Sequence, residues 1–512
     1  MSANTRAQPL PAASRDAAPA ARRSPPIADR ARGDLSWYLV ICGYFAAQAL
    51  WRRVLGGGLT LDEAEMLLWS RHLAWGYGSQ PPLYSWLQWL TFQIVPDRLL
   101  ALALLKNALL ATFYLAVYRL LRCAHPPRVA GPAALSLFLL PQISWESQRD
   151  LTHSVLVLTM AALATLAFWT RTLAGRRGGW LLFGIAVGFG LLAKANFVVV
   201  PAALLLAAAS LPELRPRLSG RGIAVAGLAT AAVAALPVRW MLAHPDLALT
   251  SVDKLGVGAG PSPAAALAAI GTLAQSLASL LALLAVVLGA IVVVLQRGTR
   301  AAAAEAPAAT PLDRLLLRTV AIGLALVLLA MIAGGMPDLR DRWLTPAVYL
   351  LAPAATVGMI ERTGSAGGRA LLRTIAVLAA LVFVALAVHV RYGRPGDPSL
   401  TRAPVEEIAA TLDARFPGAE RIVAEPAWLA GNLLYRRPDL PVVSSRVPGE
   451  APEREARVVA AWWTGDRREE IAGRLAANWG GPLRLAPAGR VSAAFPIQPA
   501  ERLDVDTAGV IR

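Results

Sequence analysis

Long apolar segments follow one another along most of this 512-residue chain, and they constrain its fold more than any other feature. A helix that crosses a bilayer needs about 20 mostly apolar residues, and somewhat fewer where the bilayer thins. Eleven segments approach this length: 35–53, 98–118, 129–145, 151–171, 179–194, 197–211, 222–241, 266–296, 315–335, 343–360 and 371–390. The sequence therefore predicts an all-α polytopic membrane protein with about eleven transmembrane helices.

The composition agrees with a membrane protein and excludes an ordinary soluble domain. Apolar residues make up 56% of the chain and charged residues only 16%. The formal net charge of +17 could suggest a nucleic-acid partner, but most of the basic residues are arginines that flank apolar segments. We therefore attribute the charge to membrane orientation and predict no nucleic-acid partner. The two cysteines cannot build a disulfide framework.

The arginine clusters predict the topology, because positive charge concentrates on the cytoplasmic side of membrane proteins. Residues 1–34 resemble a disordered basic tail on that side. Arginines both precede and follow the segment 179–211, so we expect an even number of crossings there, as a hairpin with Lys194 at its outer tip. An odd total then places the C-terminus outside, in the periplasm of a cell with an inner membrane.

Residues 395–512 differ from the rest of the chain and are predicted to form a small α/β domain in the periplasm. They hold 15 arginines and 16 acidic residues. Strand-like segments at 421–424, 440–444 and 457–463 alternate with helix-like ones. The membrane domain would then span residues 35–394.

Ionisable residues gather on the predicted outer face of the membrane domain. Solvated loops would explain many of them, but several lie in short turns at the ends of packed helices. Ionisable groups near membrane depth are costly unless they are paired or functional. The set comprises Asp62, Glu63, Glu65, Asp97, Glu146, Arg149, Asp150, His153, Lys194, Asp246, Asp253, Lys254, Asp338, Arg340, Asp341 and Arg342.

The first outer loop is the most informative part of this set. It contains Asp62 and Glu63, an aromatic-rich stretch at 69–77, and Pro81-Pro82-Leu83. Adjacent carboxylates at the start of a helix also have a structural explanation, as favourable charges at the positive end of the helix dipole. The tryptophans and tyrosines are typical of an interfacial belt.

These motifs, together with Asp150, Gly-Leu-Leu-Ala-Lys ending at Lys194, and Arg342-Trp-Leu-Thr-Pro, occur in an order that resembles the GT-C membrane glycosyltransferases. The similarity extends over residues 35–390 and is greatest to the bacterial protein-mannosyltransferase-like group, which includes aminoarabinose transferases of lipid A and rhizobial lipopolysaccharide sugar transferases. One position departs from this pattern: relatives often carry His or Lys where this chain has Gln80.

The resemblance implies a polyprenyl-phosphate sugar as donor and transfer outside the cytoplasmic membrane, with inversion, to a lipid, glycan or protein acceptor of the cell envelope. It implies that Asp62 is the catalytic carboxylate, with Glu63 beside it and Asp150 as a second acid. Lys194 and Arg342 are the implied partners of the donor phosphate. Arg340 and Arg149 are the next candidates for this contact.

The same chemistry follows from the residue types alone. A carboxylate can take the proton of an attacking hydroxyl, and cations can stabilise a departing phosphate. A divalent metal on Asp62, Glu63 or His153 is conceivable, but no metal-binding motif supports it. The rival class is a transporter or lipid flippase, which would show internal repeats and midplane charges that this chain lacks. A degenerate relative acting as a scaffold is a third alternative, kept open by Gln80.

Overall fold

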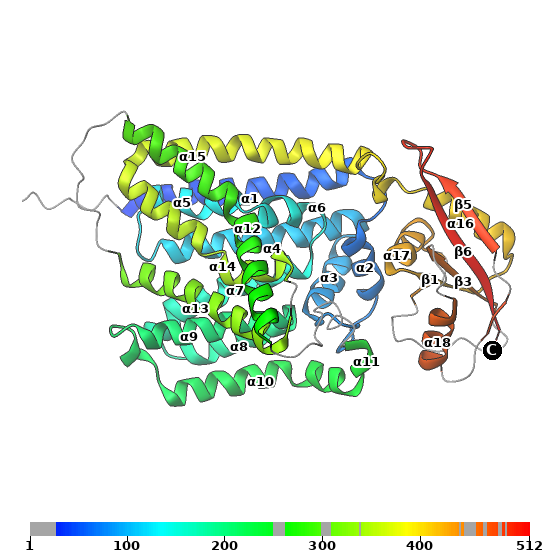
Figure 1. The fold of residues 1–512 in the computed structure, drawn as a ribbon, viewed down its shortest axis with the longest axis horizontal. Helices are drawn as coiled ribbons and strands as arrows, with labels where there is room; N and C mark the ends of the chain where they lie inside the picture. Colours follow the sequence, from blue (N-terminus) through cyan, green and yellow to red (C-terminus); the bar gives the residue numbers. More distant parts are fainter. Residues whose placement is uncertain are drawn as a thin grey trace, which may run out of the picture.

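The fold is that of a computed structural model. It describes residues 27–248, 262–297, 309–336, 339–439, 442–444, 457–463, 468–479, 484–486 and 489–511. A bundle of helices makes up most of the molecule, and a smaller domain with a β-sheet packs at one end of it (Figure 1). The mostly helical architecture agrees with the predicted fold class, while the predicted domain bounds stay a prediction.

The helices of the described residues cover most of the chain before residue 403. Their bounds are α1 Ile27–Leu55, α2 Leu61–Trp69, α3 Leu83–Ile94, α4 Arg98–Leu121, α5 Pro127–Leu135, η1 Ser136–Leu139, η2 Gln142–Glu146, α6 Ser147–Arg149, α7 His153–Ala167, η3 Phe168–Leu173, α8 Gly179–Ala193, η4 Ala195–Val198, α9 Val199–Ser210, η5 Arg215–Arg217, α10 Gly220–Ala243, α11 Pro245–Ala248, α12 Pro263–Arg297, α13 Pro311–Gly334, α14 Asp341–Val348, α15 Leu351–Tyr392 and η7 Leu400–Arg402.

Six helical segments of the described residues are long and apolar enough to cross a membrane by length and composition. They are Arg98–Leu121, His153–Leu173, Gly220–Ala243, Pro263–Gln296, Pro311–Gly334 and Leu351–Tyr392. Two shorter apolar helices, Gly179–Ala193 and Ala195–Ser210, form the expected hairpin around Lys194. The chain thus has the helices of a multi-pass membrane protein, while the count of eleven crossings stays a prediction.

Two predicted segments differ from the helices that form. The chain is already helical from Ile27, so the last part of the expected disordered tail belongs to α1, and residues 1–26 lie outside the described residues. The expected helix 129–145 is divided among α5, η1 and η2, with Pro132 and Pro141 along it. The element α15 consists of two helices that meet at a kink at Gly364, whose φ of 65° suits a glycine, which agrees with the two separate helices predicted at 343–360 and 371–390.

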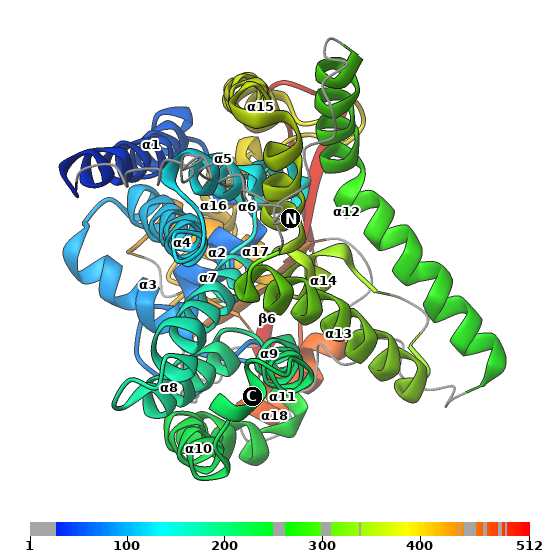
Figure 2. The ribbon, with the colours of Figure 1, turned by 90° about the vertical axis from the view of Figure 1, so that its left-hand side faces the viewer.

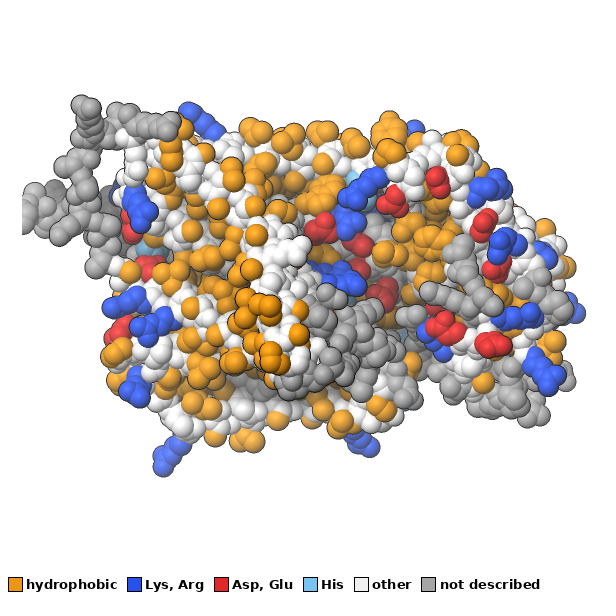
Figure 3. Space-filling model, in the orientation of Figure 1, with side chains coloured by type: hydrophobic (Ala, Val, Ile, Leu, Met, Phe, Trp, Pro, Cys, Tyr) orange, Lys and Arg blue, Asp and Glu red, His pale blue; other side chains and the backbone are white. Residues whose placement is uncertain are grey.

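The surface supports membrane embedding. Large apolar side chains point outward from the helices, among them Leu228 at 73% exposed and Val286 at 67% exposed. In Figure 3 an apolar band covers the helical part, with arginines and lysines at its far end and mixed charges over the C-terminal domain. Such a band is expected where lipid, not water, covers the protein.

Close helix packing relies on glycine. A Cβ on Gly184 of α8 would lie 2.3 Å from the backbone oxygen of Ala226 in α10. A Cβ on Gly190 would lie 2.2 Å from the ring of Phe197. The glycines of α8 therefore permit close approach of neighbouring segments, and α8 and α10 run side by side in Figures 1 and 2.

The C-terminal domain is a mixed sheet with helices. Strands β2, β1 and β3 are parallel neighbours, and β6 pairs antiparallel with β3, β4 and β5. Strands β1, β2 and β3 fall in the predicted strand-like segments, whereas β4, β5 and β6 were not predicted. The bounds are α16 Val405–Arg415, β1 Arg421–Glu425, α17 Ala427–Arg436, β2 Val442–Val443, β3 Val458–Trp463, α18 Arg468–Trp479, β4 Arg484–Leu485, β5 Gly489–Ala494 and β6 Arg502–Ile511. Helix α17 faces the membrane part and packs on α2.

Candidate active site

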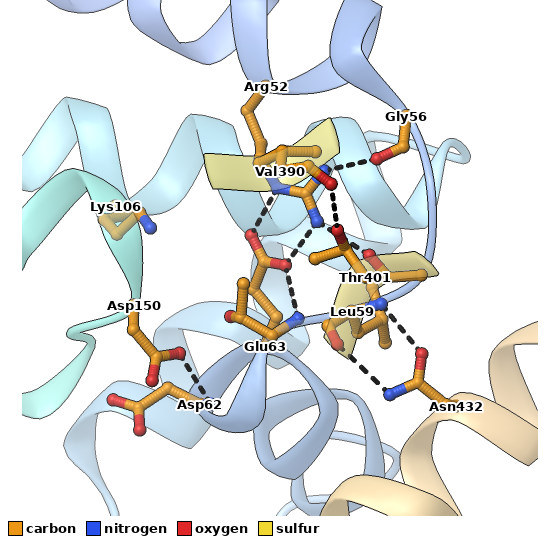
Figure 4. A network of polar contacts seen from close by, with 12 residues as sticks. Arg52, Gly56, Leu59, Asp62, Glu63, Lys106, Asp150, Val390, Thr401 and Asn432 are labelled. Carbon is orange, nitrogen blue, oxygen red and sulfur yellow. Dashed lines mark hydrogen bonds and ion pairs between the residues drawn. The ribbon is translucent and has the colours of Figure 1, made fainter. Parts of the chain in front are cut away.

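Asp62 lies in the first turn of α2 and is fixed by the segment just before α7. The backbone N–H and the hydroxyl of Thr152 each donate to its Oδ2 at 3.0 Å. The backbone N–H of Asp62 donates to Oδ1 of Asp150, also at 3.0 Å. The structure thus brings together the two carboxylates that the sequence placed in separate loops, and Figure 4 shows them facing each other.

The surroundings of Asp62 suit a proton acceptor. Burial, and then the negative charge of Asp150, raise the pKa of Asp62 to about 6, although the hydrogen bonds from Thr152 oppose the shift. A carboxylate with a raised pKa holds a proton more strongly than a solvated one, yet it remains mostly ionised at neutral pH. Among the described residues, no hydrogen bond engages Oδ1 of Asp62, so this oxygen is available to a substrate.

Cations from four elements surround this carboxylate. Electrostatic interactions link Asp62 with Arg342 of α14 and with Lys194 between α8 and η4. They also link it with Lys106 of α4 and with Arg149 of α6. Three of the four predicted phosphate partners, Lys194, Arg342 and Arg149, therefore lie within electrostatic reach of Asp62. Lys194 and Arg342 also interact with each other, and Lys194 Nζ donates to Ser154 Oγ at 2.9 Å.

Glu63 is adjacent to Asp62 in sequence but faces a different partner. Both of its carboxylate oxygens accept hydrogen bonds from Arg52, at 3.0 and 2.7 Å, and its side chain is 3% exposed. Burial alone would raise the pKa of Glu63, but Arg52 more than offsets this effect and lowers it to about 2. Glu63 also accepts from the N–H of Thr60 in a capping box that starts α2.

The remaining predicted phosphate partners lie in different settings. The Nη2 atom of Arg149 lies 2.7 Å from Oε2 of Glu146, and this ion pair occupies part of the Arg149 guanidinium. Arg340 lines a cavity of about 450 Å³ with Asp341, Trp343 and a polar face of α12. That face bears Thr272, Gln275, Ser276 and Ser279, and the Ser279 hydroxyl donates to Asp341 at 2.8 Å. Arg340 therefore belongs to a side cavity and not to the group around Asp62.

His153 was one of the candidate ligands for a divalent metal. His153 is 6% exposed at the start of α7, with its ring centroid 5.4 Å from that of Tyr84. Within the described ranges, no group of three His, Cys, Asp or Glu side chains is arranged to hold a metal ion. The divalent metal stays a prediction, and no chemistry below depends on it.

Comparison with known proteins agrees with this geometry. Residues 79–240 match the family described as dolichyl-phosphate-mannose-protein mannosyltransferase. The chain is 34% identical to the lipopolysaccharide core galacturonosyltransferase RgtB of Rhizobium johnstonii over 83% of its own length and 86% of the relative's. The chain belongs to the GT-C membrane glycosyltransferase family. This glycosyltransferase is also 31% identical to the core galacturonosyltransferase RgtA of the same organism, over 83% of the chain and 86% of RgtA.

The fold of this glycosyltransferase also resembles a solved structure. ArnT from Cupriavidus metallidurans, bound to undecaprenyl phosphate, superposes with a TM-score of 0.59 at 13% identity, covering 94% of this chain and 98% of ArnT. At this identity the match concerns the fold. The alternative of a transporter or flippase is not supported, because the relatives are glycosyltransferases.

Several residues of this glycosyltransferase were not predicted from sequence. Thr152 is an ordinary threonine in an apolar segment, and only the fold brings it to Asp62, 90 positions earlier. Arg52 resembles one of many interfacial arginines until it meets Glu63. Lys106 of α4 donates to the backbone oxygen of Gln148 at 3.0 Å. A buried lysine in an apolar helix was a usable signal.

Proposed function

We propose that this glycosyltransferase moves a sugar from a polyprenyl-phosphate donor to a lipopolysaccharide acceptor on the periplasmic face of the inner membrane. The observation that carries the proposal is the carboxylate Asp62, held by Thr152 and Asp150 and faced by Lys194 and Arg342. The reaction needs a base for the acceptor hydroxyl and positive charge for the departing phosphate, and a base and two cations at one point can supply both.

In the proposed step, the acceptor hydroxyl gives its proton to Oδ1 of Asp62 as its oxygen attacks the anomeric carbon of the donor. The bond between that carbon and the phosphate oxygen breaks, and its electron pair leaves with the polyprenyl phosphate. Lys194 and Arg342 stabilise the charge that develops on this leaving group. A single displacement of this kind inverts the anomeric configuration.

Glu63 has a supporting role in this proposal. Because Arg52 engages both of its oxygens, it is not available to a substrate. It instead fixes the beginning of α2 to the end of α1, next to Asp62. Asp150 lies beside Asp62 and accepts a hydrogen bond from the backbone N–H of that residue.

The relatives suggest the sugar and the acceptor. RgtB and RgtA are named as galacturonosyltransferases of the lipopolysaccharide core, and RgtD of the same organism, 29% identical over 40% of this chain and 43% of that protein, as a lipid A galacturonosyltransferase. We infer that this enzyme transfers a galacturonosyl group to lipopolysaccharide. The chain resembles the two core enzymes over most of its length, which favours the core as acceptor.

The test is reconstitution of the purified protein in liposomes with polyprenyl-phosphate galacturonate and lipopolysaccharide that lacks core galacturonate. Mass spectrometry should show acceptor carrying one added hexuronosyl residue and a matching amount of free polyprenyl phosphate. Polyprenyl-phosphate aminoarabinose serves as the alternative donor. Transfer of that sugar with none from galacturonate would overturn the assignment of the sugar, and no transfer from either donor would overturn the proposed activity.

A further inference from the structure

The loop that leads from α1 into α2 is held by the C-terminal domain. Both backbone groups of Leu59 pair with the side-chain amide of Asn432: its N–H donates to Oδ1 at 2.8 Å, and its oxygen accepts from Nδ2 at 3.2 Å. The same oxygen accepts from the indole N–H of Trp428 at 3.0 Å. Asn432 and Trp428 are each 1% exposed and belong to α17, so these contacts are shielded from water (Figure 4 shows Asn432).

The segment that enters the C-terminal domain holds the same loop from another side. The N–H of Gly58 donates to the Thr401 oxygen at 2.7 Å, and Arg402 donates to the Leu55 oxygen at 3.0 Å. A Cβ on Gly57 would lie 2.7 Å from the Thr401 oxygen, and its φ of 82° also requires glycine. The loop therefore has little freedom to move while the domain is in place.

A second contact joins α17 directly to α2. A Cβ on Gly431 would lie only 2.3 Å from the backbone oxygen of Ala64. Ala64 is two residues beyond Asp62 on the same helix, and Leu59 is three residues before it. Helix α17 thus contacts the chain on both sides of Asp62.

These contacts matter because α2 has only nine residues. A helix below about 12 residues has little stability of its own in water, so its position depends on what packs against it. The reaction in turn depends on position, since a displacement of about 1 Å at a reacting group can cost about a hundredfold in rate.

We propose that the C-terminal domain positions the catalytic carboxylate, with Asn432 as a positioning residue that acts through Leu59 and with Gly431 setting the distance between α17 and α2. This inference rests on the proposed function, because it takes Asp62 as the base. Neither Asn432 nor Gly431 contacts the reacting atoms.

The kinetic test compares Asn432→Ala, Trp428→Phe and Gly431→Ala with Thr507→Val in the full-length protein. Thr507 is a matched control, because it is fully buried in the same domain and donates to Gly489 at 3.0 Å, far along the chain from the loop. We expect kcat to fall about tenfold or more in Asn432→Ala and Gly431→Ala, with the donor KM within about twofold of wild type. Trp428→Phe keeps the Asn432 amide, so its kcat should fall less.

Amide exchange gives a readout that does not depend on activity. The peptide 56–66 should exchange faster in Asn432→Ala than in wild type, while Thr507→Val should leave its exchange unchanged. Gly431→Ala is informative because alanine favours the helix α17 itself, so the substitution acts through the contact with Ala64 of α2 and not through the helix propensity of α17.

The outcomes separate the two proposals. An inactive wild-type protein would overturn the proposed function. An active wild type whose kcat and loop exchange are unchanged by Asn432→Ala and Gly431→Ala would overturn the positioning role alone. Equal losses of kcat in these variants and in Thr507→Val would also overturn the positioning role, because the domain would then act only through overall stability.

Discussion

Asp62 and Glu63 are neighbours in sequence, yet their carboxylates have opposite environments. Successive residues on a helix point about 100° apart, so the two side chains meet different elements. Asp62 faces another carboxylate and cations, and its pKa is raised to about 6. Glu63 faces Arg52, and its pKa is lowered to about 2. One is suited to exchange a proton at neutral pH and the other to remain ionised.

This difference predicts the effect of Glu63→Gln. The substitution leaves Arg52, 4% exposed at its side chain, as a buried charge without a counterion. Removing one partner of such a pair typically costs about 3–5 kcal/mol. We expect a clear loss of thermal stability in detergent, measured as Tm. Equal Tm values for wild type and Glu63→Gln would contradict the structural role of this pair.

The raised pKa of Asp62 predicts the pH dependence of transfer. The base works in its ionised form, so kcat/KM should fall as pH drops through about 6, with about tenfold less activity at pH 5 than at pH 7. Asp150→Asn removes the neighbouring negative charge but keeps the oxygen that accepts from Asp62. It should therefore move this acidic limb to lower pH. An acidic limb at the same pH in wild type and in Asp150→Asn would contradict the coupling of the two carboxylates.

Among individual residues, the sequence predicted the charged groups of the site but not the neutral residues that orient them. Asp62, Asp150, Lys194 and Arg342 were recognisable because ionisable residues at the ends of apolar helices are unusual, and because the resemblance to the GT-C enzymes implied a role for each. Thr152 and Asn432 were not, because a threonine or asparagine has no such cost at its position in the sequence. Their role comes from contacts with residues 90 and 373 positions away.

Among the elements, the hairpin α8–α9 and the helix α14 supply the cations of the site. Lys194 ends α8 in an extended conformation, and Asn196 two residues later donates to the Trp343 oxygen at 2.9 Å. This bond ties the tip of the hairpin to α14, where Arg342 lies. The chain segments that carry the two cations are therefore joined by a hydrogen bond from a side chain to a backbone oxygen.

This arrangement predicts how Lys194 and Arg342 variants behave. Lys194→Met and Arg342→Met should each weaken donor use by about 1.5–3 kcal/mol, or about ten- to a hundredfold in kcat/KM for the donor. Lys194→Arg should rescue only partly, because a planar guanidinium replaces a compact ammonium. Donor titrations of the purified variants measure this, with Arg340→Met as the control from the side cavity. If Arg340→Met alone impaired donor use, the phosphate would belong to that cavity.

Apolar periodicity predicted most elements but not all of their boundaries. Segments such as 98–118 and 266–296 coincide with helices, because length and hydropathy suffice for a helix that faces lipid. The segment 129–145 is divided, since prolines along it cannot supply backbone N–H groups to a continuous helix. Helix α2, which carries Asp62, has too few residues to stand out from its aromatic-rich loop.

For the whole molecule, all the predicted catalytic residues lie near the end of the helical part that faces the C-terminal domain (Figures 1 and 4). The positive-inside pattern places the opposite end in the cytoplasm. The site and the C-terminal domain would then both lie on the periplasmic side, where lipopolysaccharide would be modified.

Reporter fusions test this orientation. Fusions after Arg373 should be cytoplasmic and fusions after Thr401 periplasmic, because the second part of α15 runs between them. Alkaline phosphatase and a fluorescent protein make a complementary pair of reporters. A cytoplasmic residue 401 would place the C-terminal domain on the wrong side for the proposed acceptor.

The central claim is that Asp62 takes the proton in sugar transfer, and the most direct measurement is single-turnover transfer by Asp62→Asn with saturating donor. Asparagine keeps the size of the side chain and an oxygen for the Thr152 hydrogen bonds, but it cannot accept the proton. The account predicts a rate lower by about 10²- to 10⁴-fold, with donor affinity and Tm close to wild type. A rate within a fewfold of wild type would contradict it.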